Sequence, residues 1–335
     1  MIEVSHLTKR YGTHTAVSDL SFHIEKGRIY GFLGPNGAGK STTMNIMTGC
    51  LSASEGSVRV GGFDIFEQPH EAKRLIGYLP ELPPLYPDRT PREYLKFVAC
   101  AKGIPAAETA AQLQDVMERT GITDVADRLC KNLSKGYRQR VGIAQALLGN
   151  PDVIILDEPT VGLDPRQIIE IRELIRSLGQ QHTVILSSHI LSEVQAVCDT
   201  ILIISKGQLV ACDTPDNLEK LFAASGAVEL TAEADWTRVQ TVLGTIADLP
   251  EAELLSQEDD RCRLKLQADK GDIDSLCRSL FFAFASAGIP LLRLSAAKAS
   301  LEDVFLELTD TENVPPQAQK AEPAEETAES EVAEA

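Results

Sequence analysis

The nine residues GPNGAGKST, from Gly34 to Thr42, constrain the fold of this 335-residue chain more than any other feature. They follow the apolar run RIYGFLG and precede the helical pattern TMNIMTG. The spacing matches G-x-x-x-x-G-K-[ST], a phosphate-binding loop between a strand and a helix. Its glycines let backbone N–H groups converge on phosphate oxygens, and the helix N-terminus adds a favourable dipole. A plain glycine-rich turn is the alternative interpretation.

The loop supplies a first set of candidate ligands for a nucleotide. Lys40 can reach the β- and γ-phosphates, and the Ser41 hydroxyl can ligate Mg²⁺. The complete set of loop residues expected to bind is Gly34, Pro35, Asn36, Gly37, Ala38, Gly39, Lys40, Ser41 and Thr42.

A pair of acids and a histidine end two further apolar runs. Asp157 and Glu158 close VIILDE, and His189 closes TVILSSH. At the carboxyl edge of parallel strands, such side chains point into a ligand crevice. We expect Asp157 to hold Mg²⁺ through water and Glu158 to orient and polarise the attacking water as a general base. We expect a neutral imidazole at His189 to contact a γ-phosphate or to position that water.

Each of these residues also has a simpler interpretation. Without the other motifs, Asp157 and Glu158 could be two solvent-exposed acids at the end of a strand. A lone histidine such as His189 is more often a hydrogen-bonded core residue. The phosphate loop upstream of them favours the functional interpretation.

Short apolar runs alternate with helical patterns over residues 1–210, which predicts α/β architecture with a sheet buried on both faces. One face of IIEIRELIRSL gathers Ile168, Ile171, Leu174, Ile175 and Leu178. The proline-rich LPPLYPDRTP and two amphipathic patterns after it predict a helical insert over about residues 82–150. We therefore expect one nucleotide-binding α/β unit over residues 1–220.

A second unit follows Gly226, and its patterns run strand, helix, strand, strand, helix, strand. That order predicts a small ferredoxin-like α+β domain over residues 226–309. The stretch SLEDVFLELT, with Ser300 as N-cap, is expected to close it as a helix. Residues 310–335 hold eight acidic residues and one lysine, with almost no large apolar residues. We expect them to form a disordered, acidic, solvated tail.

The net charge of −17 argues against a general nucleic-acid binder, because an acidic protein repels phosphate backbones. The seven cysteines never form a CxxC pair, which fits reduced thiols better than disulfides or zinc ligands. The first residues, MIEVSHLTKRYG, lack the apolar segment of a signal peptide, and we find no run of about 18 apolar residues that would span a membrane.

Taken in order, the motifs resemble those of the ATP-binding subunits of ATP-binding-cassette (ABC) transporters over residues 1 to about 215. The resemblance implies that Tyr11 stacks on adenine and that LSKGYRQR stands at the place of the family's LSGGQ signature. Ser134 and Gly136 of that stretch would contact the γ-phosphate bound by a second subunit. GLDP would touch the partner subunit through Asp164. The downstream domain resembles an extension carried by a subset of these subunits, often with exporter-type permeases.

The resemblance implies an ATPase that uses ATP and Mg²⁺. It would energise transport, in the direction of export, through ATP-dependent dimer closure. Its partners would be an integral-membrane permease and a second ATP-binding subunit, identical or different, with no nucleic acid. The chain would then lie in the cytoplasm, peripherally on the membrane through the permease. A soluble ABC ATPase of translation or DNA repair, and a regulatory module without turnover, are the alternatives.

Two positions depart from the family pattern. Glu81 stands where glutamine is usual; it can still approach Mg²⁺ through an oxygen, but it adds negative charge beside ATP. Lys135 and Tyr137 replace glycine and glutamine of the signature. The stretch LSKGYRQRVGIAQALL also permits a basic, nucleic-acid-binding helix when read by itself. The surrounding motifs favour a helix that begins at a phosphate, with Arg138 and Arg140 on its surface.

Overall fold

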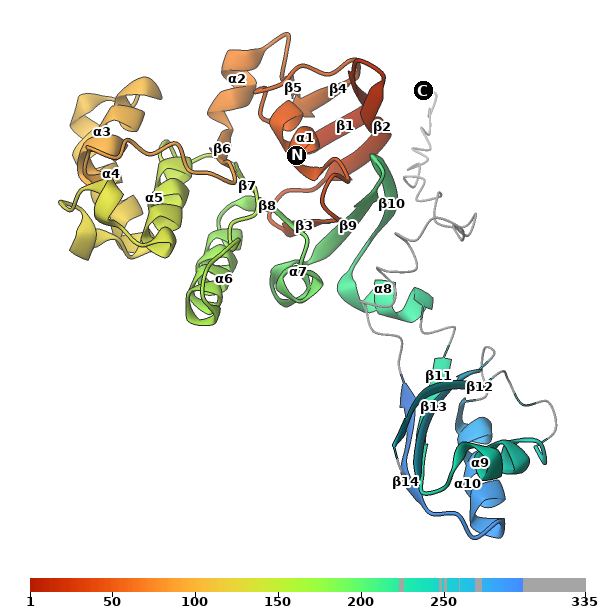
Figure 1. Cartoon of the computed structure of the whole chain (residues 1–335). Helices are drawn as coiled ribbons and strands as arrows, with labels where there is room; N and C mark the ends of the chain where they lie inside the picture. Colours follow the sequence, from red (N-terminus) through yellow and green to blue (C-terminus); the bar gives the residue numbers. More distant parts are fainter. Residues whose placement is uncertain (223–225, 247–248, 250–251, 259, 269–272, 298–335) are drawn as a thin grey trace, which may run out of the picture.

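The structure is a computed structural model that describes residues 1–222, 226–246, 249, 252–258, 260–268 and 273–297. In these parts of the chain, the strands form three sheets (Figure 1). Two sheets and their helices make up residues 1–222, and the third belongs to the C-terminal unit.

The central sheet has six strands and carries the site described below. Their order is β10 (Gln208–Asp213), β9 (Thr200–Ser205), β3 (Ile29–Leu33), β8 (Thr183–Ser188), β7 (Val153–Leu156) and β6 (Ile76–Leu79). All neighbouring pairs are parallel except β10 and β9. Every residue of β3, β7, β8 and β9 is buried. This confirms the expected α/β core, because only a sheet covered on both faces needs continuous apolar strands.

Helices cover both faces of this sheet. Helix α1 (Lys40–Met47) contributes Met44 to one apolar cluster, which also contains Phe32 of β3 and residues of the N-terminal strands. Helices α6 (Pro165–Gly179) and α7 (Leu191–Val197) belong to the cluster on the other face. The apolar stripe predicted for α6 is buried at four of its five positions, namely Ile171, Leu174, Ile175 and Leu178. Two short helices, α2 (Pro69–Arg74) and α8 (Pro215–Phe222), complete this part.

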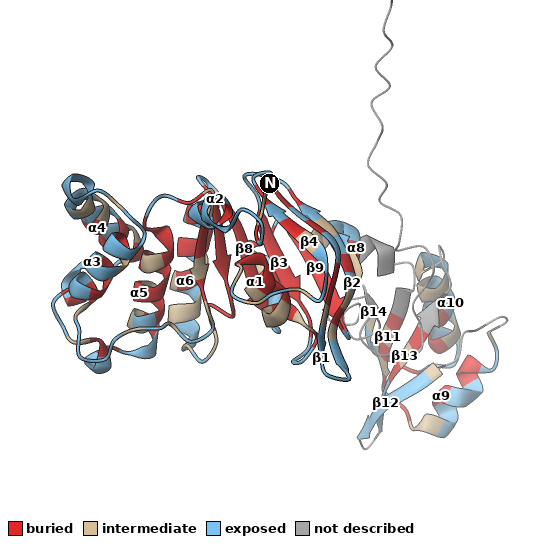
Figure 2. Cartoon of the chain, turned by 90° about the horizontal axis from the view of Figure 1, so that it is seen from above, coloured by how far each residue is buried: buried red, intermediate tan, exposed pale blue. Residues whose placement is uncertain are grey.

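The N-terminal strands form a separate antiparallel sheet, which the sequence analysis did not distinguish from the central one. Its order is β2 (His14–Ile24), β1 (Ile2–Tyr11), β4 (Glu55–Val60) and β5 (Phe63–Asp64). Strands β1 and β2 join through a tight hairpin in which Gly12 has φ 58°. Burial along β1 changes from residue to residue, as expected for strands with one solvated face. Figure 2 shows this mixture of buried and exposed residues on β1, β2 and β4.

Three helices form the predicted insert at one end of the molecule, beside β6 (Figure 1). They are α3 (Pro91–Ala101), α4 (Ala106–Thr120) and α5 (Lys135–Leu147), with short 3₁₀ turns at Thr123–Val125 and Cys130–Asn132. Helix α3 begins with a reciprocal capping box. The Glu93 N–H donates to Thr90 Oγ1 at 3.2 Å, and the Thr90 N–H donates to Glu93 Oε2 at 3.1 Å. Helix α5 also packs against β6 and β7, which ties the insert to the central sheet.

The C-terminal unit has the predicted element order. It comprises β11 (Gly226–Ala232), α9 (Trp236–Leu243), β12 (Ala252–Glu258), β13 (Arg261–Ala268), α10 (Ile273–Ser286) and β14 (Leu291–Ala297). The strands pair antiparallel in the order β12-β13-β11-β14. Its core contains Val228, Leu230, Leu264 and Phe284. The predicted SLEDVFLELT helix and the acidic tail lie outside the described residues.

None of the helices in the described ranges combines the length and the apolar content needed to cross a membrane.

Candidate active site

The order of the central strands brings motifs that are distant in sequence to one edge of the sheet. Strands β3, β8, β7 and β6 are neighbours, and they run parallel. Their carboxyl ends therefore lie side by side. Gly34 follows β3, His189 follows β8 and Asp157 follows β7, while Glu81 stands two residues beyond the end of β6. Ligand sites of open α/β sheets form at such an edge.

A pocket of about 480 Å³ opens at this edge. Its walls include Tyr11, Glu81, Glu158, His189 and the loop residues 36–42, all of them predicted site residues. The lining residues that sequence reasoning missed are His14, Ala16 and Val161. His14 and Ala16 come from β2, and no motif in the sequence indicated that this strand reaches the site.

The phosphate loop requires glycine at two positions for different reasons. Gly39 has φ 105°, a conformation that residues with a Cβ rarely adopt, and an added Cβ would lie 2.6 Å from the Ala16 carbonyl oxygen. An added Cβ on Gly34 would lie 2.3 Å from the Ile204 carbonyl oxygen. Helix α1 begins at Lys40 without a side-chain cap from any described residue. Its first N–H groups are therefore available to an anion.

Lys40 extends through the middle of this loop. The residue is 5% exposed, and its ammonium group donates to the carbonyl oxygens of Gly34 at 2.7 Å and Pro35 at 3.3 Å. Its Nζ lies 3.7 Å from Oε1 of Glu158. Burial lowers the pKa of Lys40, whereas the carboxylates of Glu158 and Asp157 favour its charged form. The arrangement thus holds a cation beside the N-terminus of α1.

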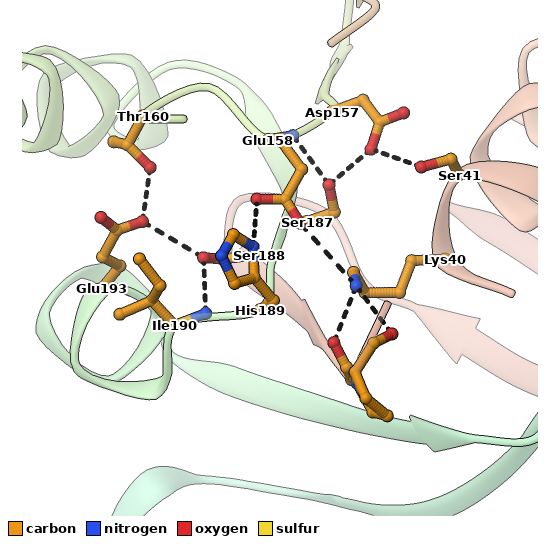
Figure 3. A network of polar contacts seen from close by, with 12 residues as sticks. Lys40, Ser41, Asp157, Glu158, Thr160, Ser187, Ser188, His189, Ile190 and Glu193 are labelled. Atoms are coloured by element: carbon orange, nitrogen blue, oxygen red, sulfur yellow. Dashed lines mark hydrogen bonds and ion pairs between the residues drawn. The ribbon is translucent and has the colours of Figure 1, made fainter. Parts of the chain in front are cut away.

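Asp157 is bound by two hydroxyl groups. The Ser41 hydroxyl donates to Asp157 Oδ1 at 3.1 Å, and the Ser187 hydroxyl donates to the same oxygen at 2.6 Å. Ser187 in turn accepts the N–H of Glu158 at 2.8 Å (Figure 3). Sequence reasoning missed Ser187, a fully buried residue of β8 two positions before His189. The sequence signal that could have indicated Ser187 is a hydroxyl residue near the end of an apolar strand.

The donors around Ser41 suit a hard cation. A serine hydroxyl and a carboxylate are oxygen ligands of the kind that Mg²⁺ takes, and Mg²⁺ usually takes few of them from the protein and the rest from phosphates and water. Among the described residues, no group of three or more histidines, cysteines and acids is arranged to hold a metal ion alone. The residues present therefore fit Mg²⁺ that arrives with a phosphate ligand.

Glu158 occupies a constrained position between a cation and an imidazole. It is 7% exposed, and its φ of 47° lies in the left-handed region that is uncommon for residues other than glycine. Oε2 lies 3.0 Å from Nδ1 of His189, and Oε1 faces Lys40 (Figure 3). Such strain persists only where surrounding contacts fix it, and it clusters at active sites.

The two remaining predicted residues of the pocket lie nearer its opening. Tyr11 is 49% exposed at the end of β1, and the Lys9 ammonium lies 5.2 Å from its ring centroid. An exposed ring at this place is free to stack on a planar ligand. Glu81 is exposed, and its negative charge favours the charged form of Lys40.

Ser134, Gly136 and Asp164 do not line this pocket. Ser134 caps α5 by accepting the Tyr137 N–H at 3.3 Å, and Asp164 caps α6 by accepting the Gln167 N–H at 2.9 Å. Gly136 packs against Gln167, whose Oε1 would lie 2.7 Å from an added Cβ. The beginnings of α5 and α6 therefore lie close together, outside the chain's own pocket.

The unusual signature residues have partners within the chain. The Tyr137 hydroxyl donates to Asp124 Oδ2 at 2.8 Å, in the helical insert. The Lys135 ammonium lies over Gly162, where it would be 2.2 Å from an added Cβ. Arg140 forms an ion pair of 2.7 Å with Glu170 of α6. Arg140 therefore serves in packing between α5 and α6, as expected for a surface residue of the helix.

Comparisons with known proteins agree with this geometry. Residues 17–161 match the family model described as ABC transporter. The linearmycin resistance ATP-binding protein of Bacillus subtilis (strain 168) is 32% identical over 310 residues, 92% of this chain and 98% of that protein. The Nod factor export ATP-binding protein I of Ralstonia nicotianae is 34% identical over 313 residues, 93% of this chain and 94% of that protein. Both alignments are too long to end at residue 222, so they include residues of the C-terminal unit.

A solved structure described as an ATP binding subunit of an ABC transporter is similar as well. It shares 30% sequence identity with this chain and superimposes with a TM-score of 0.60, over 66% of this chain and 93% of its own.

Proposed function

Because this chain belongs to the family of ABC transporter ATP-binding subunits, we propose that the pocket around Lys40 and Glu158 is its ATP site and that hydrolysis there energises export. Members of this family bind and hydrolyse ATP, and this chain is such an ATPase. We propose, beyond this, the roles of individual residues, the partners of the chain and the direction of transport.

One observation carries the residue roles. Lys40, Glu158 and His189 come from three different strand ends, line one pocket and contact one another through Glu158. Asp157 does not line the pocket, but Ser187 links it to the Glu158 N–H. Phosphoryl transfer needs positive charge and N–H groups around the transferring phosphoryl group, and a group that orients the attacking water. Lys40 and the start of α1 supply the first, and Glu158 supplies the second.

Each remaining pocket residue has a matching role. Tyr11 stacks on the adenine, and the backbone N–H groups of residues 34–42 hold the phosphates. Ser41 and Asp157 would hold Mg²⁺, which would neutralise negative charge on the phosphates when bound. Glu81 would offer a further carboxylate oxygen to the ion. His189 contacts the γ-phosphate or the water and holds the Glu158 carboxyl through its Nδ1.

The site of one chain is incomplete without a second subunit. Ser134, Gly136 and Asp164 lie outside the pocket although the family resemblance gives them a nucleotide-facing role. A second ATP-binding subunit, identical or different, would present them to the open side of this pocket. Charge that develops on the γ-phosphate then has partners on several sides, so ATP favours the closed dimer and hydrolysis reopens it.

The helical insert is proposed to contact the permease. It and the segment before it expose large apolar side chains, with Leu82 78%, Tyr86 50% and Phe97 53% exposed. Clusters of exposed apolar side chains are typical of interaction sites. Docking there would keep the chain on the cytoplasmic face of the membrane. Export is supported by relatives that match most of the chain, one of which is described as an export protein. The relatives favour this function over a soluble ABC ATPase.

Two experiments test the proposal. Purified chain should release phosphate from ATP in the presence of Mg²⁺, and the Glu158→Gln variant should bind ATP without releasing phosphate. Affinity purification of the tagged chain from detergent-solubilised membranes should recover a polytopic membrane protein. A chain that binds no ATP would contradict the assignment of the pocket, and recovery of ribosomes or DNA in place of a membrane protein would favour the soluble alternative.

A further inference from the structure

A buried carboxyl lies behind the site, outside the pocket. Glu193, in α7, is 5% exposed, and it does not line the nucleotide pocket. A carboxyl group that loses its water must be hydrogen-bonded, because an unpaired buried acid is strongly destabilising. An acid at this position therefore has partners whose identity indicates its role.

Two hydroxyl groups donate to Glu193, and both reach the same carboxyl oxygen. The Thr160 hydroxyl donates to Oε2, and the Ser188 hydroxyl donates to it at 3.1 Å (Figure 3). Thr160 and Ser188 are themselves buried, at 6% and 1% exposed. One carboxyl oxygen thus connects Thr160 and Ser188, which are 28 residues apart in the sequence.

The first segment follows Glu158. The Val161 N–H donates to the Glu158 carbonyl oxygen at 3.2 Å, and the Leu163 N–H donates to the Thr160 carbonyl oxygen at 3.2 Å. Thr160 therefore lies in the middle of a tight turn that starts at Glu158 and leads to Asp164. The hydrogen bond from the Thr160 hydroxyl to Glu193 therefore fixes this turn.

The second segment carries His189. The Ser188 hydroxyl donates to Glu193 and also accepts the Ile190 N–H at 3.0 Å. It therefore bonds to the residue that follows His189 as well as to Glu193. The Glu193 N–H completes the turn by donating to the Ile190 carbonyl oxygen at 3.2 Å. Glu193 thereby holds the backbone on both sides of His189.

We propose that Glu193 is a positioning residue that holds Glu158 and His189 at their contact distance by tying the turn at Thr160 to the turn at His189. The inference rests on the proposed ATPase function. Since Thr160 precedes Asp164, the same carboxyl links the segment that faces a second subunit to the histidine in the pocket. The positions of the two side chains matter, because misplacement of a catalytic group by about 1 Å can lower a rate about a hundredfold.

Variants of Glu193 separate positioning from packing. Glu193→Met keeps the length of the side chain but accepts no hydrogen bond, whereas Glu193→Gln keeps a carbonyl oxygen that can accept from both hydroxyls. For the full chain with Mg²⁺ and ATP, we expect Glu193→Met to lower kcat at least about tenfold and to leave KM for ATP within about twofold. We expect Glu193→Gln to recover most of kcat. A residue that only packs would change the melting temperature without this division between kcat and KM.

The two hydroxyls provide an independent test with a matched control. Thr160→Val and Ser188→Ala each remove one donor, and we expect each to lower kcat with nucleotide affinity unchanged. Thr120→Val removes a buried hydroxyl of the helical insert, which bonds to the Val116 carbonyl oxygen, and should keep the wild-type kcat. These variants decide the matter if Glu193→Met fails to fold.

The outcomes are distinguishable. This inference would be overturned, and the ATPase function would stand, if folded Glu193→Met hydrolysed ATP at the wild-type kcat. The same holds if the two folded single variants Thr160→Val and Ser188→Ala both did so. A wild-type chain that binds and hydrolyses no ATP would overturn the proposed function and this inference with it.

Discussion

The Nδ1 atom of His189 lies 3.0 Å from Oε2 of Glu158. The two residues lie just beyond the ends of strands β8 and β7, which are neighbours in the central sheet. The other oxygen of the same carboxyl faces Lys40 at 3.7 Å. A single carboxyl thus contacts the buried lysine of the loop and the residue that follows the next strand.

Replacing His189 should slow hydrolysis without preventing binding. Removal of the imidazole in His189→Ala frees Oε2 of Glu158 and removes the group that we propose contacts the γ-phosphate or positions the water. We expect kcat to fall about 10²- to 10⁴-fold, the usual contribution of such a group. Phosphate release and nucleotide affinity are measured in parallel, with His6→Ala as the control, since His6 is an exposed residue paired with Asp19. A His189→Ala enzyme that turns over like the control would contradict the role.

Lys40 should be required for binding itself. Lys40→Ala removes the cation at the start of α1 and leaves Glu158 facing the phosphates without compensation. We expect the Kd for ATP to rise at least about tenfold, equivalent to about 1.4 kcal/mol. Isothermal titration calorimetry measures this directly. Lys26→Ala, which removes an exposed ion pair with Asp152, should bind ATP normally. Equal affinities of the two variants would exclude Lys40 as a phosphate ligand.

Mg²⁺ should act together with the nucleotide. Ser41, Asp157 and Glu81 are only three side-chain ligands for an ion that takes six, so we expect weak binding of Mg²⁺ to the chain alone and tight binding with ATP. Chelation should stop phosphate release, and Asp157→Asn should raise the Mg²⁺ concentration required for half-maximal activity. Titration of Mn²⁺ by electron paramagnetic resonance, with and without nucleotide, measures both. Tight binding of the ion without nucleotide would contradict this view.

The trans arrangement of Ser134 can be tested by mixing two inactive variants. In a dimer of one Lys40→Ala and one Ser134→Ala subunit, a trans arrangement leaves one site with both residues intact. We therefore expect activity to reappear on mixing. If Ser134 served its own chain's pocket, every site would lack one residue and no activity would return. Because Ser134 also caps α5, Ser134→Ala should cost about 1 kcal/mol of stability, and its folding is checked first.

Much of the fold and of the pocket could be predicted because the phosphate loop, the acid pair and His189 each follow an apolar strand. The phosphate loop after β3 and the acids after β7 required only local patterns, and parallel strands bring their carboxyl ends to one edge. The order βαββαβ of the C-terminal unit followed from pattern as well.

What could not be predicted depends on contacts between distant segments. Burial along β1 varies in a way that hydropathy alone did not distinguish from the central strands, so its separate antiparallel sheet was missed. Ser187 and Glu193 have common residue types and no motif spacing, and only the fold brings them to Asp157 and Thr160. Their roles arise from burial, which a single sequence does not reveal at polar positions.

The central claim is that Glu158 is the base of an ATPase site whose binding residues are separate from it. Glu158→Gln keeps the size of the side chain and removes the basic carboxylate, so binding and hydrolysis should separate in one variant. We expect it to retain the wild-type affinity for ATP and to form a stable ATP-bound dimer by size-exclusion chromatography.

The most direct test is the rate of phosphate release at saturating ATP and Mg²⁺ for the wild type, Glu158→Gln and the control Glu173→Gln, which changes an exposed acid of α6. The account predicts a loss of about 10²- to 10⁴-fold for Glu158→Gln alone, with ATP still bound. A Glu158→Gln chain that releases phosphate at the rate of the Glu173→Gln control would contradict it.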